Sequence, residues 1–145
     1  MKIVIFFLIV FFNLSAFSKD VADNEKWIMS NVIDDMLSCQ SYYTIAADSM
    51  EKYGDKKNAE VIKEYSQKLS FMSFYLADSI KLKDETLSAK LDLTFKEQFE
   101  SIDFDYSNIS ILIQKYADNC KEWYEDDFIS RMHYWYDKYE KRFSN

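Results

Sequence analysis

The single histidine of the chain, His133, is the first residue to examine for chemistry, because imidazole serves both as a metal ligand and as an acid–base group. On a helix, Asp137 lies one turn after His133 and is within reach to orient its ring. Proteins also bind haem through one His and one Met, and Met29 or Met36 could supply that sulfur. A carboxylate-bridged di-metal bundle requires two histidines, which excludes that class. We therefore expect no metal and no cofactor, with His133 as a weak candidate ligand.

Acidic side chains and nucleophiles do not combine into a catalytic set. Asp34-Asp35 and Glu125-Asp126-Asp127 are adjacent in the chain, and adjacent residues of a helix face different ways, so these carboxylates do not converge on one bond. The chain has only one His, and both Cys are expected to pair with each other, so neither a Ser-His-Asp nor a Cys-His arrangement has the residues it needs. One Gly and no Pro leave little from which to build a phosphate-binding loop or a nucleophile elbow. We expect no catalytic residues, and a small secreted enzyme is the third functional hypothesis.

The two cysteines, Cys39 and Cys120, are expected to form a disulfide, because exported proteins reach oxidising compartments. Two separate buried thiols are the alternative, since both residues lie on apolar stripes. The positions of the two cysteines along the axis of the predicted bundle favour the bridge. If a turn near 101–107 makes the last helix antiparallel to the first, each cysteine lies about 20 Å from the same end of the bundle.

Residues 1–18 have the pattern of a secretory signal peptide. Lys2 precedes an unbroken apolar run from Ile3 to Phe12, and small residues follow at Ala16 and Ser18. The run is too short for a membrane-spanning helix, which needs about 20 residues. We expect cleavage after Ser18 and a periplasmic or secreted protein, with an uncleaved N-terminal anchor as the alternative.

The remaining chain, 19–145, shows apolar residues at three- and four-residue spacings and is expected to form one helical domain. Gly54 is a natural left-handed stop after the first helix, and the Ser-, Asp- and Asn-rich stretch 101–108 favours a turn before the last. We predict an all-α, up-down-up-down four-helix bundle whose long first and last helices are antiparallel and joined by the disulfide. The predicted helices cover about 23–53, 55–82, 84–101 and 107–143.

The C-terminal segment is the most aromatic part of the chain. The register set by the two cysteines makes the last helix overhang the first by about seven residues, or some 10 Å. Three consecutive rings at 134–136 point about 100° apart on a helix, so at least one must face solvent. Tyr and Trp commonly anchor partner interfaces. The candidate partner-binding residues are Tyr134, Trp135, Tyr136, Tyr139 and Phe143.

Charge narrows the class of partner. The net charge is -7, and no run of basic residues is longer than Lys56-Lys57, so the protein repels nucleic acid and anionic lipid. The sequence favours an exported helical binding protein that acts through a protein partner, as an accessory, chaperone-like, inhibitor or immunity factor. The alternative is a carrier that holds an apolar ligand or haem in the bundle interior.

Overall fold

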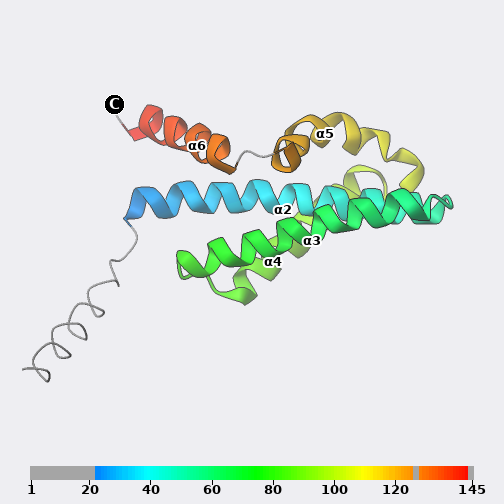
Figure 1. Ribbon diagram of the computed structural model, residues 1–145, viewed down its shortest axis with the longest axis horizontal. Coiled ribbons are helices and arrows are strands. Elements are labelled where there is room, and N and C mark those ends of the chain that lie inside the picture. The colour runs from blue at the N-terminus through cyan, green and yellow to red at the C-terminus, as the bar shows by residue number, and fades with distance from the viewer. Residues whose placement is uncertain (1–21, 126–127, 144–145) are drawn as a thin grey trace, which may run out of the picture.

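The computed structural model describes residues 22–125 and 128–143, which are helical apart from short connections (Figure 1). The predicted signal peptide, with its cleavage after Ser18, lies outside these residues. Within them there is no strand, so the predicted all-α class is confirmed. The described residues form five α-helices and one short 3-10 helix: α2 (Asp23–Lys52), α3 (Lys56–Ser79), α4 (Asp84–Ser101), η2 (Tyr106–Asn108), α5 (Ser110–Glu125) and α6 (Phe128–Phe143).

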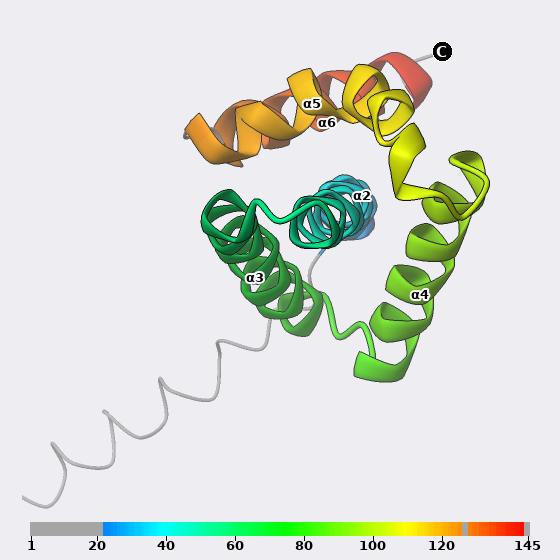
Figure 2. The same ribbon diagram turned by 90° about the vertical axis from the view of Figure 1, so that its right-hand side faces the viewer.

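Helix α2 is the centre of the structure. Viewed along its axis, α3, α4 and the pair α5 and α6 surround it on three sides (Figure 2). Its apolar residues therefore have to be buried on more than one face, which explains why they extend beyond a single heptad stripe. The fully enclosed side chains of this helix include Val32, Ile33, Met36, Leu37 and Ile45.

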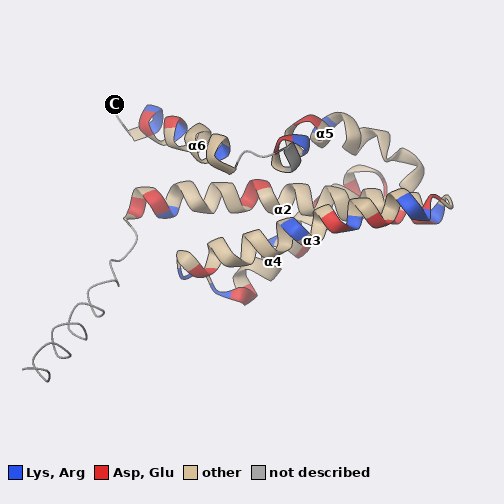
Figure 3. Cartoon of the chain, in the orientation of Figure 1, with Lys and Arg blue, Asp and Glu red and all other residues tan. Residues whose placement is uncertain are grey.

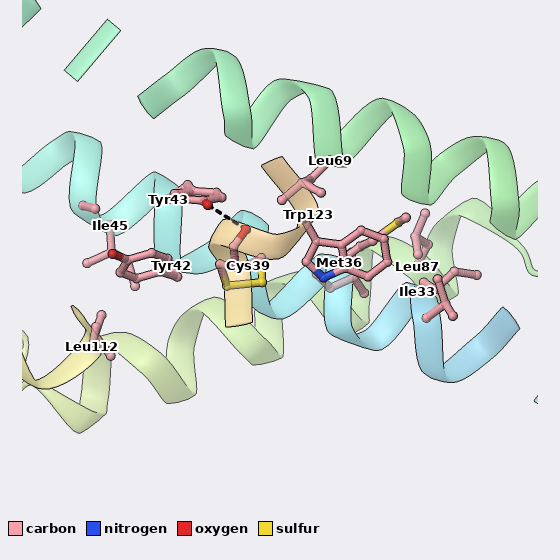
Figure 4. Close-up of a cluster of buried hydrophobic side chains, with 14 of the residues drawn as sticks. Ile33, Met36, Cys39, Tyr42, Tyr43, Ile45, Leu69, Leu87, Leu112 and Trp123 are labelled. Carbon is pink, nitrogen blue, oxygen red and sulfur yellow. Dashed lines mark hydrogen bonds between the residues drawn. A yellow bond between two sulfur atoms is a disulfide. The ribbon is translucent and has the colours of Figure 1, made fainter. Parts of the chain in front are cut away.

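The predicted Cys39–Cys120 disulfide is confirmed. It joins the middle of α2 to α5 with a Cα–Cα distance of 5.3 Å, and both cysteines are buried. Tyr43 donates a buried hydrogen bond of 2.9 Å from its hydroxyl to the Cys120 carbonyl, which ties α5 to α2 a second time. Figure 4 shows this bridge at the centre of the core, where α2 meets Leu69 of α3 and Trp123 of α5.

The connections follow the predicted pattern at the first turn. Gly54 has φ of 88°, a left-handed conformation that glycine adopts without steric cost. Asp55 then accepts a hydrogen bond from the Asn58 amide at 3.4 Å, which caps the start of α3. The later turns place Lys81, Asp103 and Phe104 in the left-handed region, so they are made without glycine.

The prediction of one helix over 107–143 is wrong, because α5 ends at Glu125 and α6 begins at Phe128. The described residues therefore form five helices, and the four-helix arrangement is not confirmed. The side chain of Arg131, in the first turn of α6, reaches back to α5, where it donates to the Asn119 carbonyl at 3.0 Å and pairs with Glu122 at 3.0 Å.

This division also removes the expected overhang of the C-terminal end. Trp135 of α6 donates a hydrogen bond to Asp35, one turn before Cys39 on α2, and its ring also packs on Trp27 nearer the start of α2. From there α6 runs antiparallel to α2, and Phe143 packs on Trp27 near the start of α2 (Figure 1). The end of α6 thus covers the first turns of α2.

Candidate functional site

One aromatic stripe of α6 holds this helix on α2. Trp135, Tyr139 and Phe143 follow one another at four-residue spacing and meet the same ring, that of Trp27 on α2. The ring centroids lie 5.8, 5.7 and 6.1 Å from that of Trp27, in edge-on or tilted geometries that favour aromatic pairs. Three of the five predicted partner-binding residues therefore also attach α6 to α2.

The other two predicted residues face solvent. Tyr134 is 45% exposed and Tyr136 is 46% exposed, whereas Trp135 between them is partly buried. The expectation that one of these three consecutive rings reaches the surface is confirmed. Phe143 combines both roles, because it is 54% exposed although one side of its ring contacts Trp27.

A polar contact fixes the register of α6 beneath these rings. Trp135 donates from Nε1 to Asp35 Oδ2 at 2.8 Å. Burial raises the pKa of Asp35 above its ordinary value, while the hydrogen bond from Trp135 and the positive charge of Arg131 oppose that shift and the charge of Asp34 adds to it. The ionised form of Asp35 is thus stabilised by the hydrogen bond and the positive charge that residues of α6 supply.

Removing this donor gives a stability change that depends on pH. Trp135→Phe is expected to lower the free energy of unfolding at pH 7 by about 1–3 kcal/mol, because Asp35 loses a hydrogen bond. The folded-state pKa of Asp35 is already raised, so stability falls as the pH rises from the unfolded-state pKa through the folded-state pKa. Without the donor this pKa rises further. The loss of unfolding free energy relative to the wild type should therefore be smallest in acid and grow towards pH 7.

The measurement is urea unfolding, followed by circular dichroism, between pH 3 and pH 7. The smaller ring of phenylalanine lowers the free energy of unfolding by the same amount at every pH. The part of the stability difference that changes with pH therefore reports the hydrogen bond. In an Asp35→Asn background the pH-dependent part should disappear, because no carboxylate remains at this position. A deficit that is the same at every pH in the Asp35 background would contradict the prediction.

A groove lies between the start of α2 and α6, and we call it the α2–α6 groove. Its volume is about 400 Å³. Its walls are largely apolar, with polar groups at Asn24, Glu25 and His133, and the last of these is exposed. The groove is lined by Asn24, Glu25, Ile28 and Met29 of α2 and by Met132, His133 and Tyr136 of α6. Met36, the other methionine considered beside His133, is instead enclosed in the core.

A second hollow, the α3–α6 hollow, lies between α3 and the start of α6. It has a volume of about 240 Å³ and is lined by Phe71, Met72, Tyr75, Leu76 and Phe128. Phe71 and Tyr75 are 75% and 72% exposed, which is unusual for large rings. Phe128 of this hollow and Met132 of the α2–α6 groove are one helical turn apart, so the two depressions are neighbours along α6.

The α3 residues of this surface were not among the predicted partner-binding residues. A signal for them exists, because Phe71 and Tyr75 fall outside the apolar stripe of α3 that runs through Leu69, Met72 and Leu76. Large rings that lie off a core stripe are candidates for a contact surface. Their position beside α6, however, follows only from the packing of both helices on α2.

Each of the described helices α2 to α6 carries both basic and acidic residues, and the two kinds are interspersed along the chain (Figure 3). In the described part of the chain, no three His, Cys, Asp or Glu side chains are grouped to hold a metal ion. The helices of residues 22–125 and 128–143 include none long and apolar enough to cross a membrane.

Comparison with protein-family models, with curated proteins and with solved structures finds no match to this chain.

Proposed function

We propose that this protein is an exported, disulfide-stapled helical protein that acts by binding a protein partner. One observation carries the proposal, namely two neighbouring apolar depressions on α6 with exposed rings of Phe71, Tyr75 and Tyr136 beside them. Large exposed apolar patches are uncommon on monomeric proteins and mark interaction sites. Tyr in particular combines a large apolar area with a hydroxyl that accepts and donates hydrogen bonds.

Export is supported by two features. A disulfide is typical of oxidising compartments, and residues 1–18 carry the pattern of a secretory signal. We place the protein in the periplasm or the extracellular medium. There it would serve as an accessory, chaperone-like, inhibitor or immunity factor.

The form of the surface supports a partner that inserts an apolar segment. The α2–α6 groove lies between two helices, a shape that accepts the apolar face of an amphipathic helix. The rings of Phe71 and Tyr75 extend the apolar surface beyond the groove along α6. A partner segment that followed α6 would therefore contact both depressions.

The surface is best tested at exposed rings that do not hold the fold together. Tyr136→Ser and Tyr75→Ser are each expected to weaken capture of the partner roughly thirtyfold, which corresponds to about 2 kcal/mol for an anchor residue. Tyr53→Ser is the matched control, because Tyr53 is 61% exposed and follows the other end of α2. Trp135→Ala and Tyr139→Ala are less suitable, since both rings contact Trp27.

The measurement is quantitative pull-down from the native host with purified wild-type and variant protein, with melting temperatures recorded in parallel. The control should capture as much partner as the wild type, and all three variants should melt within a few degrees of it. Equal capture by Tyr136→Ser, Tyr75→Ser and Tyr53→Ser would refute the proposed surface.

The second candidate function is a carrier, and the volume of the α2–α6 groove favours it. About 400 Å³ falls within the range of small-ligand sites, roughly 300–1,000 Å³. His133 and Met29 both line this groove, so the pair considered for haem ligation shares one site at the surface rather than in the bundle interior. A Soret band in the purified protein, or a ligand mass retained in native mass spectrometry, would favour the carrier.

A further inference from the structure

The α2–α6 groove carries negative charge on both of its helical walls. Glu25 of α2 lines the groove, and its side chain is exposed. On the α6 wall, the hydroxyl of Tyr136 donates a hydrogen bond to the carboxylate of Glu140, one helical turn further along. This hydrogen bond and the charges of Glu140 and Asp137 raise the pKa of the Tyr136 hydroxyl above its ordinary value. Carboxylates of two helices thus act on the same groove.

The antiparallel packing of α6 on α2 brings Glu25 and Glu140 to the same end of the groove. Trp27 follows Glu25 by two residues on α2. The centroid of its ring lies 5.7 Å from that of Tyr139 and 6.1 Å from that of Phe143, the residues on either side of Glu140 in this part of α6. The start of α2 and the end of α6 therefore lie side by side (Figure 1).

The basic side chains of α6 do not neutralise these carboxylates. Arg131 and Lys138 lie over the Tyr134 ring, at 5.9 and 5.4 Å from its centroid. Arg142 lies over the Trp27 ring at 5.9 Å. Among the described residues that line the groove there is no Lys and no Arg. The charge at this end of the groove is therefore available to a cation of a partner.

The rest of the groove suits the apolar face of a helix. Ile28 is 3% exposed, and Met29 and Met132 beside it are partly buried. Methionine side chains have three rotatable bonds and adapt to differently shaped apolar groups. A groove between two helices is a common acceptor of an amphipathic helix. Its volume of about 400 Å³ accommodates several apolar side chains of such a helix.

We propose that the partner segment of the α2–α6 groove is a basic amphipathic helix, which places apolar side chains on Ile28, Met29 and Met132 and a Lys or Arg beside Glu25 and Glu140. This inference rests on the proposed function and adds the chemistry of the partner. Opposite charges across an interface favour the correct partner, and like charges exclude a wrong one. The net charge of -7 also attracts a basic segment from a distance.

The experiment uses two synthetic peptides, each about 14 residues long, which is roughly 20 Å as a helix. Both carry leucine at three- and four-residue spacing, with lysine at the other positions in one peptide and glutamate in the other. Fluorescence anisotropy of the labelled peptides measures their affinity for the purified protein. The lysine peptide should bind roughly tenfold more tightly or better. This ratio should shrink as NaCl is raised from about 20 mM to about 500 mM, because salt screens exposed charges.

Two double variants separate the groove from the overall charge. Glu25→Gln/Glu140→Gln keeps the side-chain size and an acceptor for Tyr136, and it should weaken binding of the lysine peptide roughly three- to tenfold. Glu85→Gln/Glu97→Gln is the matched control, because it removes the same charge from exposed positions of α4, one of them in the first turn as Glu25 is on α2. The control should bind within about twofold of the wild type.

Methyl NMR signals of labelled methionines locate the bound peptide. The signals of Met29 and Met132 should shift, whereas those of Met36 and Met50 should stay in place, because these two residues lie outside the groove. Four outcomes would overturn the proposal: no binding of either peptide, equal affinity for both, equal losses in the two double variants, or shifts confined to methionines outside the groove.

The failure of this proposal can be distinguished from failure of the proposed function. If both peptides bind equally in the groove and Tyr136→Ser weakens each of them, the partner surface stands and only the preference for a basic partner is wrong. Equal capture of host proteins by Tyr136→Ser, Tyr75→Ser and Tyr53→Ser refutes the proposed surface itself, whichever peptide binds.

Discussion

Replacing both Cys39 and Cys120 with alanine is expected to lower the free energy of unfolding by about 4.5 kcal/mol, the largest effect predicted for this protein. The bridge closes a sequence separation of 81 residues. In the chain-entropy account, loss of the bridge raises the conformational entropy of the unfolded chain, by an amount that increases with the logarithm of the number of residues in the closed loop. Domains are stable by only about 5–15 kcal/mol, so the variant should retain a small margin.

Packing adds to this effect in the folded state. Both sulfurs are enclosed by the core, and the Tyr43 hydroxyl bonds to the carbonyl of Cys120 itself. Without the bridge, α5 would be held on α2 only by such side-chain contacts.

The measurement is chemical unfolding of three samples. The first is the oxidised wild type, the second is the wild type with its disulfide reduced and kept reduced throughout, and the third is the alanine double variant. The two samples without a bridge should share a midpoint far below that of the oxidised protein. An alanine variant that unfolded at the wild-type midpoint would contradict the prediction.

Trp27→Ala is expected to release α6 from α2 at a cost of about 3 kcal/mol, the second largest effect. This ring contacts Trp135, Tyr139 and Phe143, and no residue of α6 is fully buried. The attachment of α6 therefore rests on a few partly buried rings and on the Trp135–Asp35 hydrogen bond. Arg142, which lies over the Trp27 ring at 5.9 Å, would lose its cation–π contact as well.

The released helix should be visible by hydrogen exchange. Amides in 128–143 are expected to lose protection in Trp27→Ala, while those of α2 around Val32–Ile45 keep it, because the core beneath them is unchanged. Trp27→Phe is the matched control, since it retains a ring at this position and should preserve most of the protection. Uniform loss of protection over the whole chain would contradict a local role for Trp27.

This variant also tests the dependence of the proposed partner surface on α6. The α2–α6 groove and the α3–α6 hollow each take one wall from α6, so release of this helix should abolish partner capture. Elements that form binding surfaces are often the less stable parts of a protein. Here the disulfide fixes α5, and α6 is held beyond it by weaker contacts.

Much of the helical part of the fold could be predicted from local sequence. Apolar periodicity marked α2, α3 and α4, and the single glycine at Gly54 marked the end of α2. The pairing of Cys39 with Cys120 was expected from the predicted export, and the antiparallel direction of the helices that carry them supported it. These features depend on spacing and on backbone preferences within a few residues, which a sequence displays directly.

The division between α5 and α6 could not be predicted in this way. No Gly or Pro occurs there, and the spacing of four from Tyr124 to Phe128 and Met132 continues the helical pattern. The position of α6 depends instead on contacts with residues distant in sequence, above all Trp27 and Asp35. Burial of a stripe against another element commonly overrides local helix preference.

The sequence by itself thus determined the all-α class, the first turn and the disulfide, because each depends on local period or on a single pair of residues. Only the tertiary structure decided which aromatic rings support α6 and which face solvent. It also decided that residues of α2 and α6 line one groove, since that groove exists only where the two helices pack. Local periodicity records that a residue is apolar, but the packed structure determines which neighbour covers it.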